Sequence, residues 1–231
     1  MRILRVVIAV LVMAGPAAAQ ETVSFPTEDG GLVYADVYGE GERGVVLAHG
    51  GRFNKGSWEK QARELAKAGF RVVAIDFRGY GQSRGPGQSD PLAAPLHYDV
   101  LAAVRYLRNT GAKTVSAVGG SMGGSAAADA AIEAPSEIDR LVLLGAEAGT
   151  GRVGPPEKLK GRKLFIVSRD DTRGDGVVRL VKIREQYEKT PEPKELVILE
   201  GSAHAQFLFE TNQGERVMRE ILRFLAQEQA R

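Results

Sequence analysis

The sequence contains no cysteine among its 231 residues. Cysteine nucleophiles, thiolate-ligated metal sites and disulfide bonds are therefore excluded, and the folded chain depends on its core alone. A strong excess of charge of either sign is also missing, because 31 basic residues face 29 acidic ones. At 43% hydrophobic residues, the chain has enough apolar material for a globular domain with a sizeable core.

The first residues show the pattern of a secretory signal peptide. Two arginines and an apolar run precede Ala17-Ala18-Ala19, which has the small residues of a cleavage site. A membrane anchor is the alternative, but Gly15-Pro16 breaks the run short of the roughly 20 residues that a span needs. We expect cleavage after Ala19, with residues 20–231 forming one domain that is exported to the periplasm or secreted.

Cleavage would remove two of the 31 basic residues and none of the 29 acidic ones, so the mature chain would have a formal net charge of zero. A chain without excess positive charge gives no reason to expect a nucleic acid or an anionic membrane as partner. We therefore expect neither nucleic-acid binding nor a stable membrane anchor.

Short apolar runs alternate with helical patterns along the chain. Two strand-like runs, 22–25 and 32–38, flank a Glu-Asp-Gly-Gly turn and predict an antiparallel hairpin. Later runs are typical of strands buried on both faces, with helical patterns between them: 44–48, 70–77, 114–118, 141–144, 163–167 and 195–199. The pattern predicts an α/β protein with a mostly parallel central sheet and helices on both faces. The connection 145–162 is too short for a cap domain. Earlier in the chain, we expect Ser57 to be the N-cap of the helical pattern that begins next to it.

One serine stands at the apex of a tight turn. The run Gly119-Gly120-Ser121-Met122-Gly123 follows a predicted strand and leads into an alanine-rich helical stretch. A serine between strand and helix in a Gly-x-Ser-x-Gly turn is a nucleophile elbow, whose glycines avoid a collision of the two elements. The same pattern recurs around Ser83, but Pro86 follows and no helix can begin there. Ser121 is therefore the candidate nucleophile, and Ser83 is predicted to be a loop residue.

Acyl transfer also requires a base, an acid that orients it, and donors for an oxyanion. The three histidines are His49, His97 and His204. His204 follows the last predicted strand, and loops after the carboxyl ends of parallel strands meet at one edge of the sheet. His204 can therefore face Ser121, although a solvated loop histidine is the alternative. His97, at a helix start, is predicted to be structural.

The orienting acid should lie on a loop between the serine and the histidine. Strand 163–167 leads into Asp170 and Asp171, and both are candidates. Aspartates in a loop can also serve turn formation alone. Glu147, which follows the predicted strand 141–144, is a further candidate for the orienting acid.

In chain order, a serine on an elbow, an aspartate and then a histidine resemble the α/β-hydrolase superfamily. The stretches Asp76-Phe77-Arg78-Gly79-Tyr80-Gly81 and His49-Gly50 are also similar to stretches common in that superfamily. The resemblance covers about residues 33–225. It implies an α/β-hydrolase fold without a cap domain.

The family pattern also implies roles for single residues. The acid usually stands third after a small strand-end residue, and Ser168 occupies that position, which favours Asp171 over Asp170. The turn after His49 resembles the family's oxyanion turn, which implies the backbone N–H of Gly51 as a donor, with Arg52 as the alternative. The second donor would be the N–H of Met122, at a helix start where N–H groups are unsatisfied.

The function that this resemblance implies is a serine hydrolase acting on small carboxylic esters through an acyl-enzyme. The small lidless format is similar to dienelactone-hydrolase-like esterases, but dienelactone hydrolases proper use cysteine where Ser121 stands, which argues against a lactone. No metal or organic cofactor is implied, and the expected partner is a small-molecule ester. A peptidase or acyltransferase with the same triad and a non-catalytic binding protein are the alternatives.

Export can be tested on the N-terminus of the protein. When the full chain is produced in a bacterial host, we expect the periplasmic or secreted material to begin at or near Gln20, as measured by intact mass. An Ala19→Arg variant, which spoils the small residue at the cleavage site, should accumulate uncleaved. Full-length protein retaining Met1 in the wild-type preparation would contradict the prediction.

Overall fold

The computed structural model describes residues 20–227, apart from residues 92, 150 and 151. The predicted signal peptide, residues 1–19, lies outside the described residues, so its cleavage stays a prediction. The described part of the chain forms an eight-stranded sheet in the order β1-β2-β4-β3-β5-β6-β7-β8. Its strands are β1 Glu21–Pro26, β2 Leu32–Tyr38, β3 Arg43–Ala48, β4 Arg71–Ile75, β5 Thr114–Gly120, β6 Arg140–Leu144, β7 Arg162–Ser168 and β8 Lys194–Leu199. Its helices are α1 Glu59–Lys67, α2 His97–Asn109, α3 Met122–Glu133, α4 Arg179–Lys189 and α5 Gly214–Ala226, with 3₁₀ turns η1 Lys55–Trp58, η2 Pro156–Lys158 and η3 Ala205–Glu210.

The predicted fold class is confirmed by the pairing of the strands. Strands β1 and β2 form the expected antiparallel hairpin, and β2 joins the rest of the sheet by antiparallel pairing with β4. From β4 through β3 to β8 every pair is parallel. The loops after the parallel strands therefore end at a common edge of the sheet.

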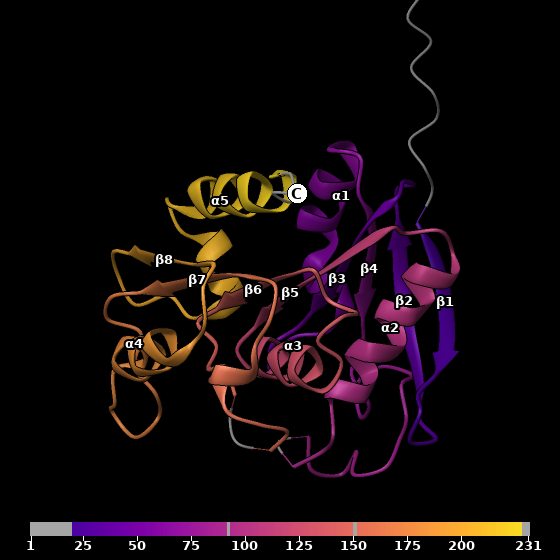
Figure 1. Cartoon of the computed structure of the whole chain (residues 1–231), viewed down its shortest axis with the longest axis horizontal. Coiled ribbons are helices and arrows are strands. Elements are labelled where there is room, and N and C mark those ends of the chain that lie inside the picture. The colour runs from indigo at the N-terminus through magenta and orange to yellow at the C-terminus, as the bar shows by residue number, and fades with distance from the viewer. Residues whose placement is uncertain (1–19, 92, 150–151, 228–231) are drawn as a thin grey trace, which may run out of the picture.

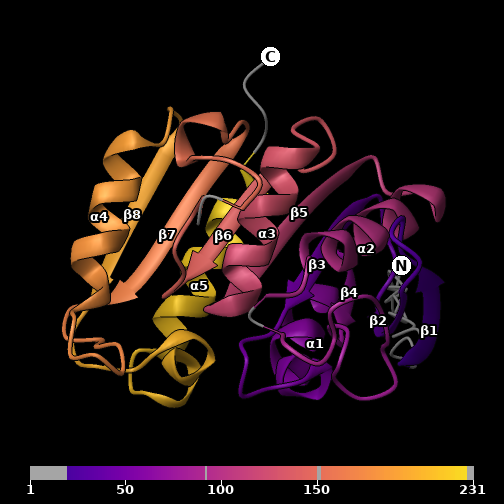
Figure 2. The same cartoon turned by 90° about the horizontal axis from the view of Figure 1, so that it is seen from below.

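Helices cover both faces of the sheet. Figure 1 shows α1 and α5 above the sheet and α2, α3 and α4 below it. The view turned by 90° shows α4, α3 and α2 in sequence across one face, with β1 and β2 at one end of the sheet and β8 at the other (Figure 2). The described connection from β6 to β7 carries only the turn η2 and no additional helical layer.

The continuous apolar runs of the inner strands arise because both faces of the sheet are buried. In β3, Val46 and Ala48 pack on the side of α2 and α3, whereas Val45 and Leu47 pack on the side of α1 and α5. Successive side chains of a strand point to opposite faces, so a strand that is covered twice needs apolar residues at every position.

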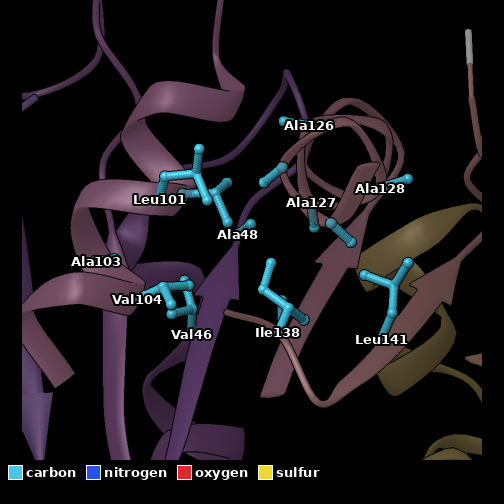
Figure 3. Packing of buried hydrophobic residues seen from close by; sticks show 14 of the residues in the cluster. Val46, Ala48, Leu101, Ala103, Val104, Ala126, Ala127, Ala128, Ile138 and Leu141 are labelled. Carbon is cyan, nitrogen blue, oxygen red and sulfur yellow. The ribbon is translucent and has the colours of Figure 1, made fainter. Parts of the chain in front are cut away.

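Helix α3 is rich in alanine because it lies close to the sheet. Ala126, Ala127 and Ala128 are all buried, and Figure 3 shows Ala127 on the side of the helix that faces the strands. Small side chains let the helix backbone approach the strands, and larger ones would push it outward. The close approach fixes the start of α3 relative to the end of β5, where Ser121 is located.

The expectation that Ser57 caps α1 is wrong. Trp58 occupies the N-cap position without a side-chain capping bond, and Ser57 belongs to the preceding turn η1. That turn is capped by Asn54, whose side-chain oxygen accepts a hydrogen bond from the backbone N–H of Gly56 at 2.9 Å. Ser57 thus lies one residue before the N-cap of α1 and three residues after the N-cap of η1, so it caps neither.

A buried ion-pair cluster fixes the loop after β4. The guanidinium of Arg78 is inaccessible to solvent and contacts Asp99 at 2.6 Å and Asp29 at 2.5 Å. Burial raises the pKa of Asp99 against the opposing effect of Arg78. Since removal of one partner would leave an uncompensated buried charge, the cluster constrains the loop that carries Tyr80.

No helix in the described ranges combines the length and the apolar character needed to cross a bilayer.

The packing beneath the Ser121 turn predicts a strong effect of one methyl group. A Cβ added to Gly123 would lie 2.3 Å from the carbonyl oxygen of Ala48, whereas one added to Gly174 would meet nothing within 4 Å. We expect Gly123→Ala to lower the free energy of unfolding by about 3 kcal/mol or more, at the upper end for overpacking. Gly174→Ala should stay within about 0.5 kcal/mol of the wild type. Urea unfolding measures both changes, and equal midpoints for the two variants would contradict this account.

Candidate active site

Ser121 occupies a strained backbone position between β5 and α3. Its φ is 50° and its ψ is −120°, a conformation that costs a non-glycine residue about 1–3 kcal/mol. The strain persists because the surroundings define the turn: the N–H of Ser121 donates to Leu144 O at 3.0 Å, and its carbonyl accepts from Ser125 N at 3.0 Å. A Cβ on Gly119 would lie 2.5 Å from the backbone of Gly123, so only glycine fits there.

Ser121, His204 and Asp171 form a continuous hydrogen-bonded chain. His204 Nε2 lies 2.8 Å from Ser121 Oγ, and His204 Nδ1 lies 2.7 Å from Asp171 Oδ2. Asp171 is almost completely buried, while the side chain of His204 remains 27% exposed. An acceptor carboxylate at Nδ1 fixes the proton on that nitrogen and leaves Nε2 free to accept the serine proton.

The two adjacent aspartates differ in their surroundings. Asp170 is exposed, and its backbone N–H donates to Gly201 O at 3.0 Å. Asp171 points inward, where its Oδ1 lies 3.3 Å from Arg179 Nε and its carbonyl accepts from Arg179 N at 2.7 Å. Ser168, at the end of β7, donates from Oγ to Ala203 O at 2.7 Å and so ties the aspartate loop to the chain before His204.

Glu147, the substitute acid, has a different partner. Its Oε1 lies 3.2 Å from Arg173 Nη1, and its backbone carbonyl accepts a hydrogen bond from Ser125 Oγ at 2.8 Å. Asp171, and not Glu147, is the carboxylate that contacts the imidazole of His204.

His49 lies in the core beside the site. The backbone N–H of Phe77 donates to His49 Nε2 at 3.3 Å, so the ring proton is on Nδ1, which donates to Gly50 O at 2.8 Å. Burial lowers the pKa of His49, which keeps the ring neutral near pH 7. Its ring packs edge-on against Phe77 and Tyr80, and this arrangement is that of a structural histidine.

The two remaining candidates from the sequence, His97 and Ser83, have other partners. His97 is the first residue of α2, where its ring packs on Tyr98, and burial lowers its pKa. Ser83 is completely buried in the loop after β4, and its Oγ accepts a hydrogen bond from Tyr34 N at 2.8 Å. Within the described residues, neither side chain forms a hydrogen bond with Ser121, His204 or Asp171, so both fit structural roles.

Gly51 and Met122, the expected oxyanion donors, both lie next to the phenol of Tyr80. Tyr80 donates its phenolic hydrogen to Gly51 O at 2.9 Å, and its oxygen lies 4.0 Å from Met122 Sδ. Met122 is the first residue of α3, where the backbone N–H groups have no partner within the helix. Gly51 and Arg52 are both exposed at this edge of the sheet.

A cavity of about 470 Å³ opens beside Ser121. Its polar wall includes Arg173, which pairs with Glu147 and Asp175, and Arg179, which pairs with Asp171. A second cavity of about 430 Å³ lies on the other side of Met122 and Ser125, which line both spaces, and its wall is mostly apolar. Within the described residues no cluster of histidine and carboxylate side chains is suited to hold a metal ion.

Several residues that contact the site were not identified from the sequence. A Cβ on Gly145 would lie 3.1 Å from His204 Nδ1 and 3.2 Å from Asp171 Oδ2, so the backbone after β6 touches the His–Asp pair. Arg179 and Gln206 likewise contact the site from distant parts of the sequence. Position was the one signal available, since Gly145 and Gln206 each follow a predicted strand.

Residues 44–182 match the model of the alpha/beta hydrolase fold family. AB hydrolase superfamily protein YisY of Bacillus subtilis is 33% identical over 162 residues, which are 64% of this chain and 57% of that protein. Serine hydrolase BPHL of Homo sapiens is 38% identical over 142 residues, which are 58% of this chain and 47% of that protein. The chain thus matches only about half the length of these relatives. Among solved structures, dienelactone hydrolase from Anabaena variabilis superposes with a TM-score of 0.71 at 21% identity, over 89% of this chain and 96% of the other.

Proposed function

The chain belongs to the alpha/beta hydrolase fold family, and from this premise we propose that it is a serine hydrolase that cleaves small carboxylic esters through an acyl-enzyme. The observation that carries the proposal is the unbroken chain of hydrogen bonds from Ser121 Oγ through His204 to Asp171, with distances of 2.8 and 2.7 Å. The similarity to a human relative named as a serine hydrolase supports it.

Each member of the chain has a distinct role. His204 Nε2 accepts the proton of Ser121 Oγ as the oxygen attacks the ester carbonyl carbon, and the imidazolium then donates this proton to the departing alcohol. Asp171 stabilises the imidazolium and holds its tautomer. Water, activated by the same imidazole, then attacks the acyl-enzyme and restores Ser121.

Backbone N–H groups stabilise the oxyanion that forms in both steps. The proposed donors are Met122 and Gly51, with Arg52 as the alternative to Gly51. The carbonyl of Gly50 accepts bonds from His49 Nδ1 and from Phe53 N at 3.0 Å. The C=O of Gly50 and the N–H of Gly51 belong to one trans peptide group and point in opposite directions. The bonds to the carbonyl therefore also fix the direction of the Gly51 N–H. Such preoriented donors are effective because they need no reorganisation during the reaction.

The shape of the site supports a small substrate. Ser121 opens into a cavity of about 470 Å³, and no additional helical layer covers it in the described connection from β6 to β7. A peptidase or acyltransferase would use the same three side chains, and a panel of ester and peptide substrates separates these possibilities.

A non-catalytic protein is disfavoured by the backbone of Ser121, because a binding role gives no reason to retain a strained serine at φ 50°. Labelling with a fluorophosphonate tests this point directly, since the reagent requires an activated serine.

The proposed setting of this activity is outside the cytoplasm. It rests on the signal-peptide pattern of residues 1–19. A small ester encountered in the periplasm or the medium would be the substrate.

Ser121→Ala should lower kcat for ester hydrolysis by about 10⁴-fold or more, because the attacking oxygen is removed while the fold is unchanged. Ser83→Ala is the matched control, since Ser83 stands in the same sequence pattern. It should keep its kcat and lose stability only, because Tyr34 N loses its acceptor. Steady-state kinetics and thermal unfolding measure both. Substantial turnover by Ser121→Ala would rule out the proposed nucleophile.

The neighbouring aspartates give a second matched pair. Asp171→Asn should lower kcat by about 10⁴-fold, because an amide opposite His204 Nδ1 favours the wrong tautomer. Asp170→Asn should leave kcat within about threefold of the wild type, because its side chain is exposed. A large loss in Asp170→Asn with little change in Asp171→Asn would reverse the assignment. Near-normal rates in both would transfer the role to Glu147.

A further inference from the structure

Gln206 connects two parts of the site that are 156 residues apart in the sequence. It stands two residues after His204 and is almost completely buried. Its Oε1 accepts a hydrogen bond from Gly50 N at 2.7 Å, and its Nε2 donates to Ser57 Oγ at 2.6 Å. A single amide therefore joins the loop of His204 to the turn that contains Gly51.

The orientation of this amide is determined by its partners. Ser57 uses its own hydroxyl hydrogen to bond Asn54 O at 2.6 Å. Its oxygen can then only accept, which requires the NH₂ group of Gln206 to face Ser57 and the carbonyl to face Gly50. Both ends of the side chain are satisfied, so Gln206 has one stable orientation.

The partner of Gln206 is the peptide group immediately before the oxyanion turn. Gln206 holds the N–H of Gly50, while the carbonyl of Gly50 is held by His49 and Phe53. Both peptide groups that flank Gly50 are thus fixed, and the second of them carries the N–H of Gly51. A Cβ on Gly50 would lie 3.3 Å from Gln206 Oε1 and 3.4 Å from Gly120 O, which leaves little room for the turn to shift.

The backbone between the histidine and the glutamine is strained. Ala205 has φ 52°, an unfavourable value for a residue with a Cβ. Such a conformation persists only where neighbouring contacts enforce it. The two hydrogen bonds of Gln206, directly after Ala205, supply contacts of this kind and transmit the position of one loop to the other.

We propose that Gln206 is a positioning residue that sets the oxyanion turn relative to His204. This inference rests on the proposed function, because the N–H of Gly51 must act on a developing negative charge. Gln206 touches no reacting atom. It acts by holding the N–H of Gly51 in place, because even a small displacement of this donor would weaken stabilisation of the oxyanion.

The test replaces Gln206 by a side chain of similar length that cannot accept a hydrogen bond. Gln206→Met should lower kcat by about 10–100-fold with KM changed less than about threefold, since loss of an oxyanion donor itself costs about 10²–10³-fold. Ser57→Ala, which frees the other end of the amide, should give a smaller loss of about 3–10-fold. Gln61→Met is the matched control, because Gln61 is also buried but lies on α1.

Fluorophosphonate labelling of Ser121 separates this inference from the choice of substrate. The reaction at phosphorus also develops charge on an oxygen, so the labelling rate should fall in Gln206→Met and Ser57→Ala and stay unchanged in Gln61→Met. Thermal unfolding of all three variants identifies effects on folding, and if Gln206→Met does not fold, the exposed Ser57→Ala carries the test.

Two results would overturn the positioning role. One is wild-type labelling and kcat in a folded Gln206→Met or Ser57→Ala variant. The other is an equal loss in Gln61→Met, which would mean that any buried substitution has this effect. Failure of the wild-type protein to label at all would instead remove the proposed function, and the role of Gln206 with it.

Discussion

The geometry of the site depends on the close approach of three backbones beneath Ser121. Strands β3 and β5 and helix α3 meet where Gly119 and Gly123 carry no side chain, and a Cβ at Gly123 would lie 2.3 Å from Ala48 O. This contact permits the tight turn in which Ser121 has a φ of 50°, and Ser121 Oγ lies 2.8 Å from His204 Nε2. His204 can reach that oxygen, and Asp171 can reach His204, because their loops leave the same edge of a parallel sheet.

Much of this arrangement could be predicted from the sequence because it follows from local rules. Strands buried on two faces need continuous apolar runs, and a tight turn between strand and helix needs glycines, so the sheet and the Ser121 turn left clear patterns. The parallel direction of the strands then explains why a histidine after β8 can lie near a serine after β5, because both loops leave the same edge of the sheet although β6 and β7 lie between. The residues alone could not decide between Asp170 and Asp171, since the turn conformation buries one beside Arg179 and exposes the other.

The contacts that could not be predicted are those between single polar side chains far apart in the chain. Gln206 bonds Gly50 and Ser57, and no periodicity or spacing marks such a pairing. The assignment of Ser57 as a helix cap failed for a related reason. The serine stands beside a helical pattern, but the 3₁₀ turn before that helix begins earlier and takes its cap from Asn54. Secondary-structure propensity depends on residues that are adjacent in sequence, whereas the partners of these side chains are adjacent only in the folded structure.

The order of the site residues along the chain has a consequence for biosynthesis. His204 is 83 residues beyond Ser121 and 33 beyond Asp171, and it follows β8, the last strand and one edge of the sheet. A nascent polypeptide therefore contains Ser121 long before His204, its proposed base, has been synthesised, and an incompletely folded one keeps the two apart. Under the proposed mechanism, Ser121 has no base to activate it until β8 docks. On the proposed export route, the chain would stay chemically inert inside the cell that makes it and gain reactivity only on folding at its destination.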